Sequence, residues 1–193
     1  MIDRLKERLL ASRLILPDEF FAKADQFTRM LLNWNKVHNL TGAKHAIEVE
    51  RHIYDSVYPL VFLEEFRSAI DIGSGAGFPA LMLAMAKPQT LFTLVEPLIK
   101  RASFLQFAAR ALRLDNVSVA DRRIEQMPPI VYELITSRAV GRAKTIYDLA
   151  LPFMDSETIL LLYKGKNTAI EAESIGAEAI KTEHAVYLIA NRH

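Results

Sequence analysis

Three glycines at alternate positions, Gly73, Gly75 and Gly77, follow a short apolar run that contains Asp71. Residues 80–86 after them are Ala, Leu and Met only. A buried strand that turns sharply into a helix has this pattern. Glycine can adopt positive φ and lets a ligand approach the backbone closely, while the first turn of the helix offers unpaired N–H groups. The sequence therefore predicts a ligand site here, in preference to an ordinary strand-to-helix turn that binds nothing.

The glycine spacing separates two classes of nucleotide-binding turn. A dinucleotide-binding turn has its third glycine three positions after the second, whereas Gly77 stands two positions after Gly75. An acid two positions before the first glycine, as Asp71 is here, resembles the Rossmann-like methyltransferases that depend on S-adenosylmethionine. This resemblance implies S-adenosyl-L-methionine as the cofactor.

A second acid is expected to belong to the same site. Residues 91–95 read as a buried strand that ends at Glu96, about 20 residues beyond the glycines. In βαβ nucleotide folds a carboxylate at this place accepts hydrogen bonds from ribose hydroxyls. The alternative is that Glu96 is a solvated acid in a turn.

The composition limits the class of protein. The chain has 193 residues, of which 51% are hydrophobic, and 24 basic against 23 acidic residues give a net charge of +1. A nucleic-acid partner therefore needs a local basic patch. With no cysteine, the chain has no disulfide, thiolate metal site or cysteine nucleophile. We expect no bound metal. No export signal is expected because the N-terminus mixes both charge signs and lacks an apolar region, and no membrane partner is expected because no run reaches about 18 apolar residues. A cytoplasmic monomer is the expectation.

The order of the predicted elements indicates an α/β fold with a mostly parallel sheet and an antiparallel C-terminal edge. Helices are expected at 2–11, from 18 onward and from 46 onward, before the first strand, with no Gly/Ser-rich linker between them and it. We therefore expect an N-terminal helical extension, 1–65, packed on a methyltransferase domain, 66–193. The strands are predicted at 69–72, 91–95, 116–120, 130–136, 158–163, 179–182 and 185–190.

Further candidates follow the later strands. Ile124 and Glu125 come after the third strand, where folds of this class cover the adenine ring. The tetrapeptide 137–140 ends the fourth strand and contains Arg138. Because open α/β sheets bind ligands at the carboxyl ends of their strands, this segment is expected to border the reacting methyl group. The helix expected at 98–112 should turn Ile99, Ala102, Leu105, Phe107 and Ala109 inward.

Several blocks of the chain resemble one family, the ribosomal small-subunit RNA guanine-N7 methyltransferases, also called glucose-inhibited division protein B (RsmG/GidB). The glycine turn alone indicates a methyltransferase, and the Asn-rich helix end and the Ser-Arg-Ala block point to this family. Ala80 departs from the pattern, which has a glycine there, and the C-terminal end is shorter than is usual. The matching blocks are 33–36, 39–41, 51–53, 55–56, 71–79, 100–101, 104–105, 137–139 and 164–165.

The resemblance implies methyl transfer from S-adenosylmethionine to N7 of a guanine in 16S ribosomal RNA of the small subunit. By similarity the cofactor contacts fall on Gly73, Phe78, Ile124, Glu125 and Arg138. The residues themselves add Asp71, Gly75, Gly77 and Glu96.

This chemistry agrees with the residues that the chain lacks. Guanine N7 has a free lone pair at neutral pH, so its attack on a methyl group needs in-line placement and exclusion of water, and no general base. Methyl transfer to C5 of a pyrimidine commonly uses a cysteine, and exocyclic amines use an Asn/Asp-Pro-Pro-aromatic motif, where this chain has Ser137-Arg138-Ala139. No catalytic acid or base is therefore predicted.

Two roles remain open for Arg138, which could bind the cofactor's carboxylate or a carbonyl near the methyl group, or could hold guanine O6. His52 is expected to be a structural histidine. A basic surface for RNA phosphates is predicted from Lys36, Arg51, Lys100, Arg101, Lys164 and Lys166.

Two rival functions are consistent with parts of the sequence. The same fold could methylate a small molecule or a protein, which the small net charge mildly favours. A non-catalytic NAD(P)-binding module is disfavoured by the glycine spacing and by the lack of a separate substrate domain.

Overall fold

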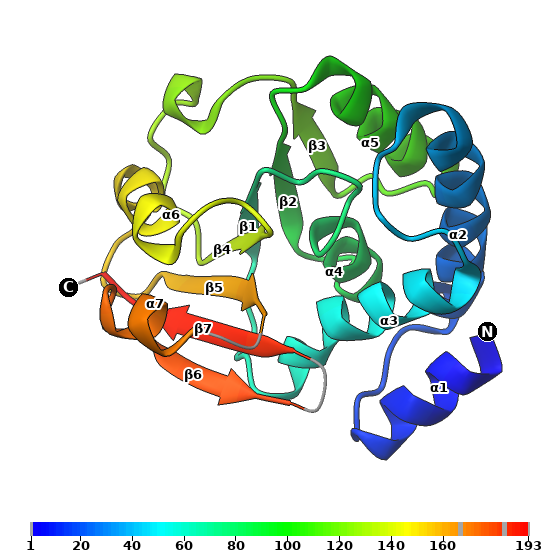
Figure 1. The fold of residues 1–193 in the computed structure, drawn as a ribbon, viewed down its shortest axis with the longest axis horizontal. Coiled ribbons are helices and arrows are strands. Elements are labelled where there is room, and N and C mark those ends of the chain that lie inside the picture. The colour runs from blue at the N-terminus through cyan, green and yellow to red at the C-terminus, as the bar shows by residue number, and fades with distance from the viewer. Residues whose placement is uncertain (1, 166–167, 183–184, 193) are drawn as a thin grey trace.

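The computed structural model describes residues 2–165, 168–182 and 185–192. Within these ranges seven strands form one sheet in the order β3-β2-β1-β4-β5-β7-β6 (Figure 1). β1 to β5 are parallel, and β7 is antiparallel to its neighbours β5 and β6. The predicted mostly parallel sheet with an antiparallel edge is confirmed. The strands are β1 (Ser68–Ile72), β2 (Leu91–Val95), β3 (Val117–Ala120), β4 (Leu134–Arg138), β5 (Ile159–Lys164), β6 (Glu178–Lys181) and β7 (Val186–Ala190).

Helices cover both faces of the sheet. The α-helices are α1 (Ile2–Ala11), α2 (Asp18–His38), α3 (Ala46–Val57), α4 (Ala80–Ala86), α5 (Ile99–Ala111), α6 (Ala143–Ala150) and α7 (Ala169–Glu173). Short 3-10 turns are η1 (Tyr58–Val61), η2 (Ile124–Gln126) and η3 (Leu151–Phe153).

Two hydrophobic clusters hold these layers together, because alternate residues of a buried strand point to opposite faces of the sheet. One cluster joins α1 to α5 to the sheet and includes Phe27, Ile53 and Leu105. The other lies under α6 and α7 and includes Ile70 and Ile146. Figure 1 shows the two groups of helices on either side of the sheet.

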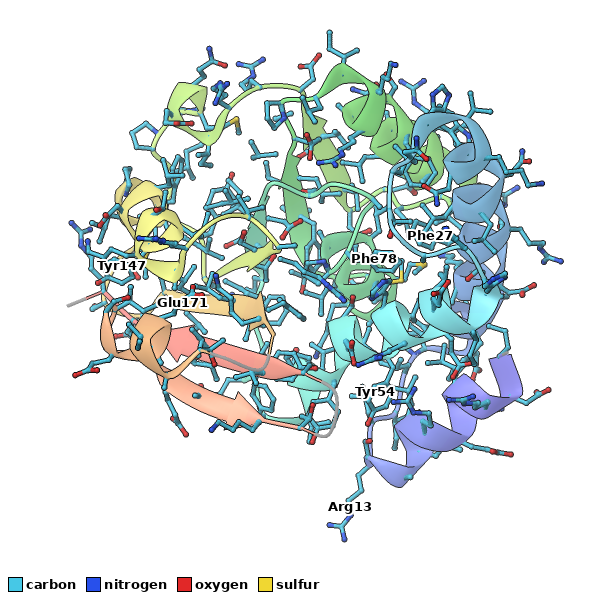
Figure 2. All side chains as sticks on the ribbon, in the orientation of Figure 1. Arg13, Phe27, Tyr54, Phe78, Tyr147 and Glu171 are labelled. Carbon is cyan, nitrogen blue, oxygen red and sulfur yellow. The ribbon has the colours of Figure 1, made fainter. Side chains whose placement is uncertain are left out.

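The N-terminal helices are attached to the sheet by polar contacts as well as by the core. The Tyr163 hydroxyl on β5 donates to the main-chain oxygen of Ser56 at 2.8 Å, and the Tyr187 hydroxyl on β7 donates to that of Asp55 at 3.0 Å. Both acceptors are on α3, so α3 is bonded to two strands. Helix α1 packs on α3 in turn, where the Arg8 guanidinium lies 3.9 Å from the ring centre of Tyr54 (Figure 2).

The prediction that the fourth strand begins at residue 130 is wrong. β4 begins at Leu134, opposite Ala69 of β1. β1 itself begins only at Ser68, so the residues before Leu134 have almost no strand to pair with. Ile130 and Val131 are exposed instead, in an irregular segment after two prolines.

The inward faces predicted for Ile99 and Phe107 on α5 are also wrong. The helix buries Ala102, Leu105 and Ala109 as predicted, together with Phe104 and Ala108, but Ile99 is 75% exposed. Phe107 lies on the flank of α5, where its ring stacks on Trp34 of α2 at 5.5 Å between centroids. The contact between two helices, which the sequence of α5 alone does not contain, explains this aromatic position.

Candidate active site

The glycine turn lies between β1 and α4, at the carboxyl edge of the sheet. The main-chain N–H groups of Gly73 and Ser74 both donate to the carbonyl of Val95, at 2.9 and 3.1 Å. The turn is thereby attached to the end of β2. All three glycines have positive φ, as the pattern of the sequence predicts.

Gly75 and Gly77 have different structural roles in the turn. A Cβ on Gly77 would lie 2.5 Å from Leu81 and 3.3 Å from Leu105, so this position is a packing requirement of the core. A Cβ on Gly75 would meet nothing nearer than the Gly73 carbonyl at 3.8 Å. Gly75 therefore presents the open face of the turn, where a ligand can approach the backbone.

The segment after β4 bends back over the turn. Ala139 and Gly141 both have positive φ, and Val140 lies so close to Gly73 that a Cβ there would be 2.5 Å from a Val140 methyl. Glu171 fixes the far end of the segment, because its carboxylate accepts from the Ala143 N–H at 2.7 Å (Figure 2). Residues 139–142 thus form one wall of the site.

Lys164 has a structural partner in the same wall. Its ammonium pairs with Glu171 at 2.7 Å and donates to the carbonyl of Gly141 at 2.9 Å. This pairing also helps to hold the pKa of Glu171 below its usual range. In this structure the charge of Lys164 is paired with Glu171. A contact of Lys164 with an RNA phosphate stays a prediction.

Asp71 is a buried acid with one unused oxygen. Its Oδ1 accepts from Thr136 Oγ1 at 2.6 Å, while Oδ2 has no hydrogen-bond partner among the described residues. Burial raises the pKa of Asp71 to about 7. A carboxylate in this setting is suited to a cationic ligand group, which would supply the missing partner.

Glu96 is bonded to the glycine turn. It is 2% exposed, and its two oxygens accept from the N–H groups of Gly75 at 2.8 Å and Leu98 at 2.9 Å. The alternative of a solvated turn acid is excluded by this burial. The carboxylate has lone pairs left for a hydroxyl donor and lies next to the open glycine.

Replacing Glu96 by alanine is expected to weaken cofactor binding by about 1–3 kcal/mol, because it removes a charged acceptor and frees the Gly75 N–H. Titration calorimetry with S-adenosylmethionine measures the change. Glu157→Ala is a matched control, since Glu157 is exposed and precedes β5, at the opposite edge of the sheet. Equal affinity of both variants would remove Glu96 from the cofactor site.

A cluster of four side chains adjoins the turn. Arg138 Nη2 lies 2.7 Å from His52 Nδ1 and 3.9 Å from a carboxylate oxygen of Asp55. Phe78 lies beneath them, with its centroid 5.3 Å from that of His52 and 5.9 Å from the guanidinium. Burial lowers the pKa of Arg138, and the charge of Asp55 opposes this shift. Phe78 in turn packs edge-on against Phe27 of α2 (Figure 2).

Three members of this cluster, His52, Asp55 and Arg138, line a cavity of about 610 Å³. Its walls come from α3, the end of β4, the segment 139–142 and the end of β5. A base or a small ring fits within such a volume. A second hollow, of about 770 Å³, adjoins the first at residues 42–43 and is lined in part by Lys36 and Lys44.

The other predicted residues are dispersed. Ile124 is buried in the second core cluster and Glu125 is exposed beside it. Arg51 lines the cavity, while Lys100 and Arg101 are on the first turn of α5. Ala80 is fully buried in the first core cluster. Lys166 lies outside the described residues.

Sequence reasoning missed Asp55 and Tyr163 as parts of this site. It placed Val140 in the segment expected to border the methyl group, and it favoured a structural role for His52. The spacing of His52 and Asp55 places both on one face of α3, which was the available signal. Their contact with Arg138 joins segments more than 80 residues apart, which no local pattern contains.

The described residues contain neither a membrane-spanning helix nor a cluster of metal ligands. In those parts of the chain no helix has the length and apolar character to span a bilayer. No group of three or more His, Cys, Asp or Glu side chains is placed there to hold a metal ion.

The strand order, the glycine turn and the acid after β2 define a Rossmann-like fold of the class of S-adenosylmethionine-dependent methyltransferases. The solved structure of an O-methyltransferase from Bacillus cereus, in complex with SAH, matches the whole chain over its own full length with a TM-score of 0.67 and 15% identity. Coclaurine N-methyltransferase matches 84% of the chain over 57% of its own length with a TM-score of 0.55 and 18% identity. At these identities the likeness concerns the fold.

The sequence comparisons assign the family. The family model described as rRNA small subunit methyltransferase G matches residues 21–192, and the chain belongs to this family, GidB. The protein named ribosomal RNA small subunit methyltransferase G from Wolinella succinogenes is 45% identical over 88% of this chain and 88% of its own. Its counterpart from Helicobacter hepaticus is 45% identical over 90% of this chain and 96% of its own. The resemblance inferred from the sequence motifs is confirmed.

Proposed function

We propose that this protein transfers a methyl group from S-adenosylmethionine to N7 of a guanine in 16S ribosomal RNA, as a cytoplasmic monomer. The observation that carries the proposal is that two residues lining the 610 Å³ cavity, His52 and Arg138, pack on Phe78 at the end of the glycine turn. A methyl donor on the turn and a base in the cavity would then be neighbours. Membership of the GidB family supports ribosomal RNA as the acceptor.

The residues around the turn fit the donor. Glu96 and the open backbone at Gly75 would hold its adenosine part, and the unpartnered Oδ2 of Asp71 suits its ammonium group. Arg138 would face its carboxylate, as the resemblance to the family implies. When bound, S-adenosylmethionine supplies a methyl group on a positively charged sulfur.

The cavity suits a guanine acceptor. Attack by N7 needs the base to be held in line with the methyl group and shielded from water, and it needs no proton transfer. Its wall contains Tyr163, whose hydroxyl is engaged with Ser56 and whose pKa burial raises well above its ordinary value. The pKa of His52 is held at about 4 by burial and by the charges of Arg138 and Arg51. Neither group is poised to take up a proton at neutral pH, and N7 requires none.

A local basic surface supports a polyanion as the partner, although the net charge is only +1. Arg51 is on the rim of the cavity, and Lys36 and Lys44 line the adjoining hollow. An RNA strand whose base enters the cavity could continue across residues 42–43 toward these lysines. Phosphate contacts of this kind position a nucleic acid without reading its sequence.

The proposal is tested by incubating the protein and labelled S-adenosylmethionine with small ribosomal subunits that lack their native modifications. The label is then mapped by cleavage at N7-methylguanine. We expect one modified guanine in 16S RNA, and no label with Arg138→Lys, which keeps the charge and loses the planar fork of donors. Cofactor binding by calorimetry is measured for both proteins.

The outcomes separate the parts of the proposal. Label at several positions or at another atom would overturn the assignment of a specific guanine N7. If the cofactor binds but no RNA is labelled, the proposed cofactor site stands, and the acceptor would have to be a small molecule or a protein.

A further inference from the structure

The His52 ring is held in place on two sides within the wall of the cavity. Arg138 Nη2 lies 2.7 Å from its Nδ1, and Arg138 Nη1 lies 3.4 Å from its main-chain oxygen. The Phe78 ring packs against the imidazole at 5.3 Å between centroids, with the two rings tilted by 54°. The imidazole therefore has a fixed position beside the guanidinium.

This contact fixes the tautomer of the ring. A guanidinium can only donate, so Nδ1 must be the acceptor and the ring proton is on Nε2. With a pKa near 4 the ring is neutral at neutral pH. No hydrogen bond uses Nε2, so His52, which lines the cavity, carries a neutral N–H donor that has no acceptor among the described residues.

We infer that His52 is a specificity-determining residue whose Nε2–H donates to O6 of the acceptor guanine. The inference rests on the proposed function. O6 adjoins N7 on the same edge of guanine, so one donor there orients the base and leaves the N7 lone pair free. Adenine carries an amino group in place of O6, and two donors would face each other.

The neutral state of the ring suits this role. A cationic donor at O6 would withdraw more electron density from the purine and make N7 a weaker nucleophile. Burial and the charge of Arg138 keep His52 neutral, and Arg138 occupies Nδ1, so that Nε2 is the nitrogen left to donate. This gives Arg138 a contact with the acceptor side as well as with the proposed cofactor.

Two substitutions separate donation to O6 from mere support of Arg138. In His52→Asn the amide oxygen can replace Nδ1 as acceptor, but the side chain ends before the position of Nε2. In His52→Gln the longer amide brings an N–H group close to that position. We expect kcat/KM for small ribosomal subunits to fall about tenfold in His52→Asn and to stay within about threefold in His52→Gln.

The affinity for S-adenosylmethionine, measured by calorimetry, should be unchanged in both variants, which also checks that they fold. The reverse order of the variants, or an equal loss accompanied by weaker cofactor binding, would overturn the inference and leave His52 as a support for Arg138. Full activity of His52→Asn would overturn it as well.

A change in the acceptor gives an independent readout. Subunits are reconstituted with RNA that carries 2-aminopurine, which lacks O6 and keeps N7, at the mapped guanine. The wild-type protein should lose about tenfold in rate on this RNA, and His52→Asn should lose nothing further. Equal losses for both proteins would contradict the pairing of His52 with O6.

Failure here is distinguishable from failure of the proposed function. If the wild-type protein labels guanine N7 and the His52 variants do not follow the expected order, only the role of His52 fails. If the wild-type protein labels no RNA, the proposed function fails and this inference fails with it.

Discussion

Gly75→Ala is expected to lower the affinity for S-adenosylmethionine by roughly 2–3 kcal/mol or more, because it places a methyl group on the open face of the turn. The added Cβ would contact only the Gly73 carbonyl, at 3.8 Å, so the fold has room for it. The cost to folding is about 1–2 kcal/mol, for an alanine held at a φ of +54°.

Gly77→Ala is the matched control, because this change should reduce the stability of the fold more than the affinity for the cofactor. Its Cβ would lie 2.5 Å from Leu81 and 3.3 Å from Leu105, at a φ of +95°. We expect the free energy of unfolding to fall by about 2–4 kcal/mol through strain and overpacking in the core.

Urea unfolding and calorimetric titration of both variants test the contrast between the two glycines. The expected pattern is a large loss of binding with a small loss of stability for Gly75→Ala. A Gly75→Ala protein that binds the cofactor like the wild type would show that the ligand does not lie over this face of the turn.

The stability of the cofactor-free protein should decrease as the pH rises from about 4 to about 7, because of Asp71. Burial raises the pKa of this carboxyl from 3.8 to about 7 in the folded state. Below pH 4 both states hold the proton, and between the two values only the folded state keeps it. The free energy of unfolding therefore falls through this window, by up to roughly 4 kcal/mol, and levels off above pH 7.

Asp71→Asn should remove this contribution, because the amide does not titrate and can still accept from Thr136. The difference between wild-type and variant unfolding curves at pH 5 and pH 8 isolates Asp71 from other titrating groups. A difference that is independent of pH would mean that the carboxyl is ionised throughout the range. The variant should also bind S-adenosylmethionine about tenfold to a hundredfold more weakly, through the lost charge-assisted contact.

The part of the site that is local in the chain could be predicted from the sequence. The glycine turn follows from a strand, three glycines and a helix within 20 residues, and Glu96 follows from its place at the end of the next strand. Parallel strands bring their carboxyl ends to one edge, so Arg138 at the end of β4 could also be placed there.

The rest of the site depends on contacts that only the tertiary structure creates. His52 and Arg138 meet because α3 packs beside β4, and Lys164 meets Glu171 because α7 returns to the end of β5. In the sequence, Lys164 could not be distinguished from a phosphate-binding lysine, because its charge and its place after a strand are the same in both cases. Local patterns also placed the start of β4 too early, since strand length depends on where the neighbouring strand begins.

The two tyrosines that bond α3 to the sheet determine how an acceptor reaches the cavity. Swinging α3 outward would break the bonds from Tyr163 and Tyr187 and expose two phenol rings that are now at most 6% accessible. That motion uncovers too much apolar surface to accompany each turnover. We therefore expect helix α3 to stay fixed, so that a nucleotide of the proposed RNA substrate would have to leave its own stack and enter between α3 and the segment 139–142.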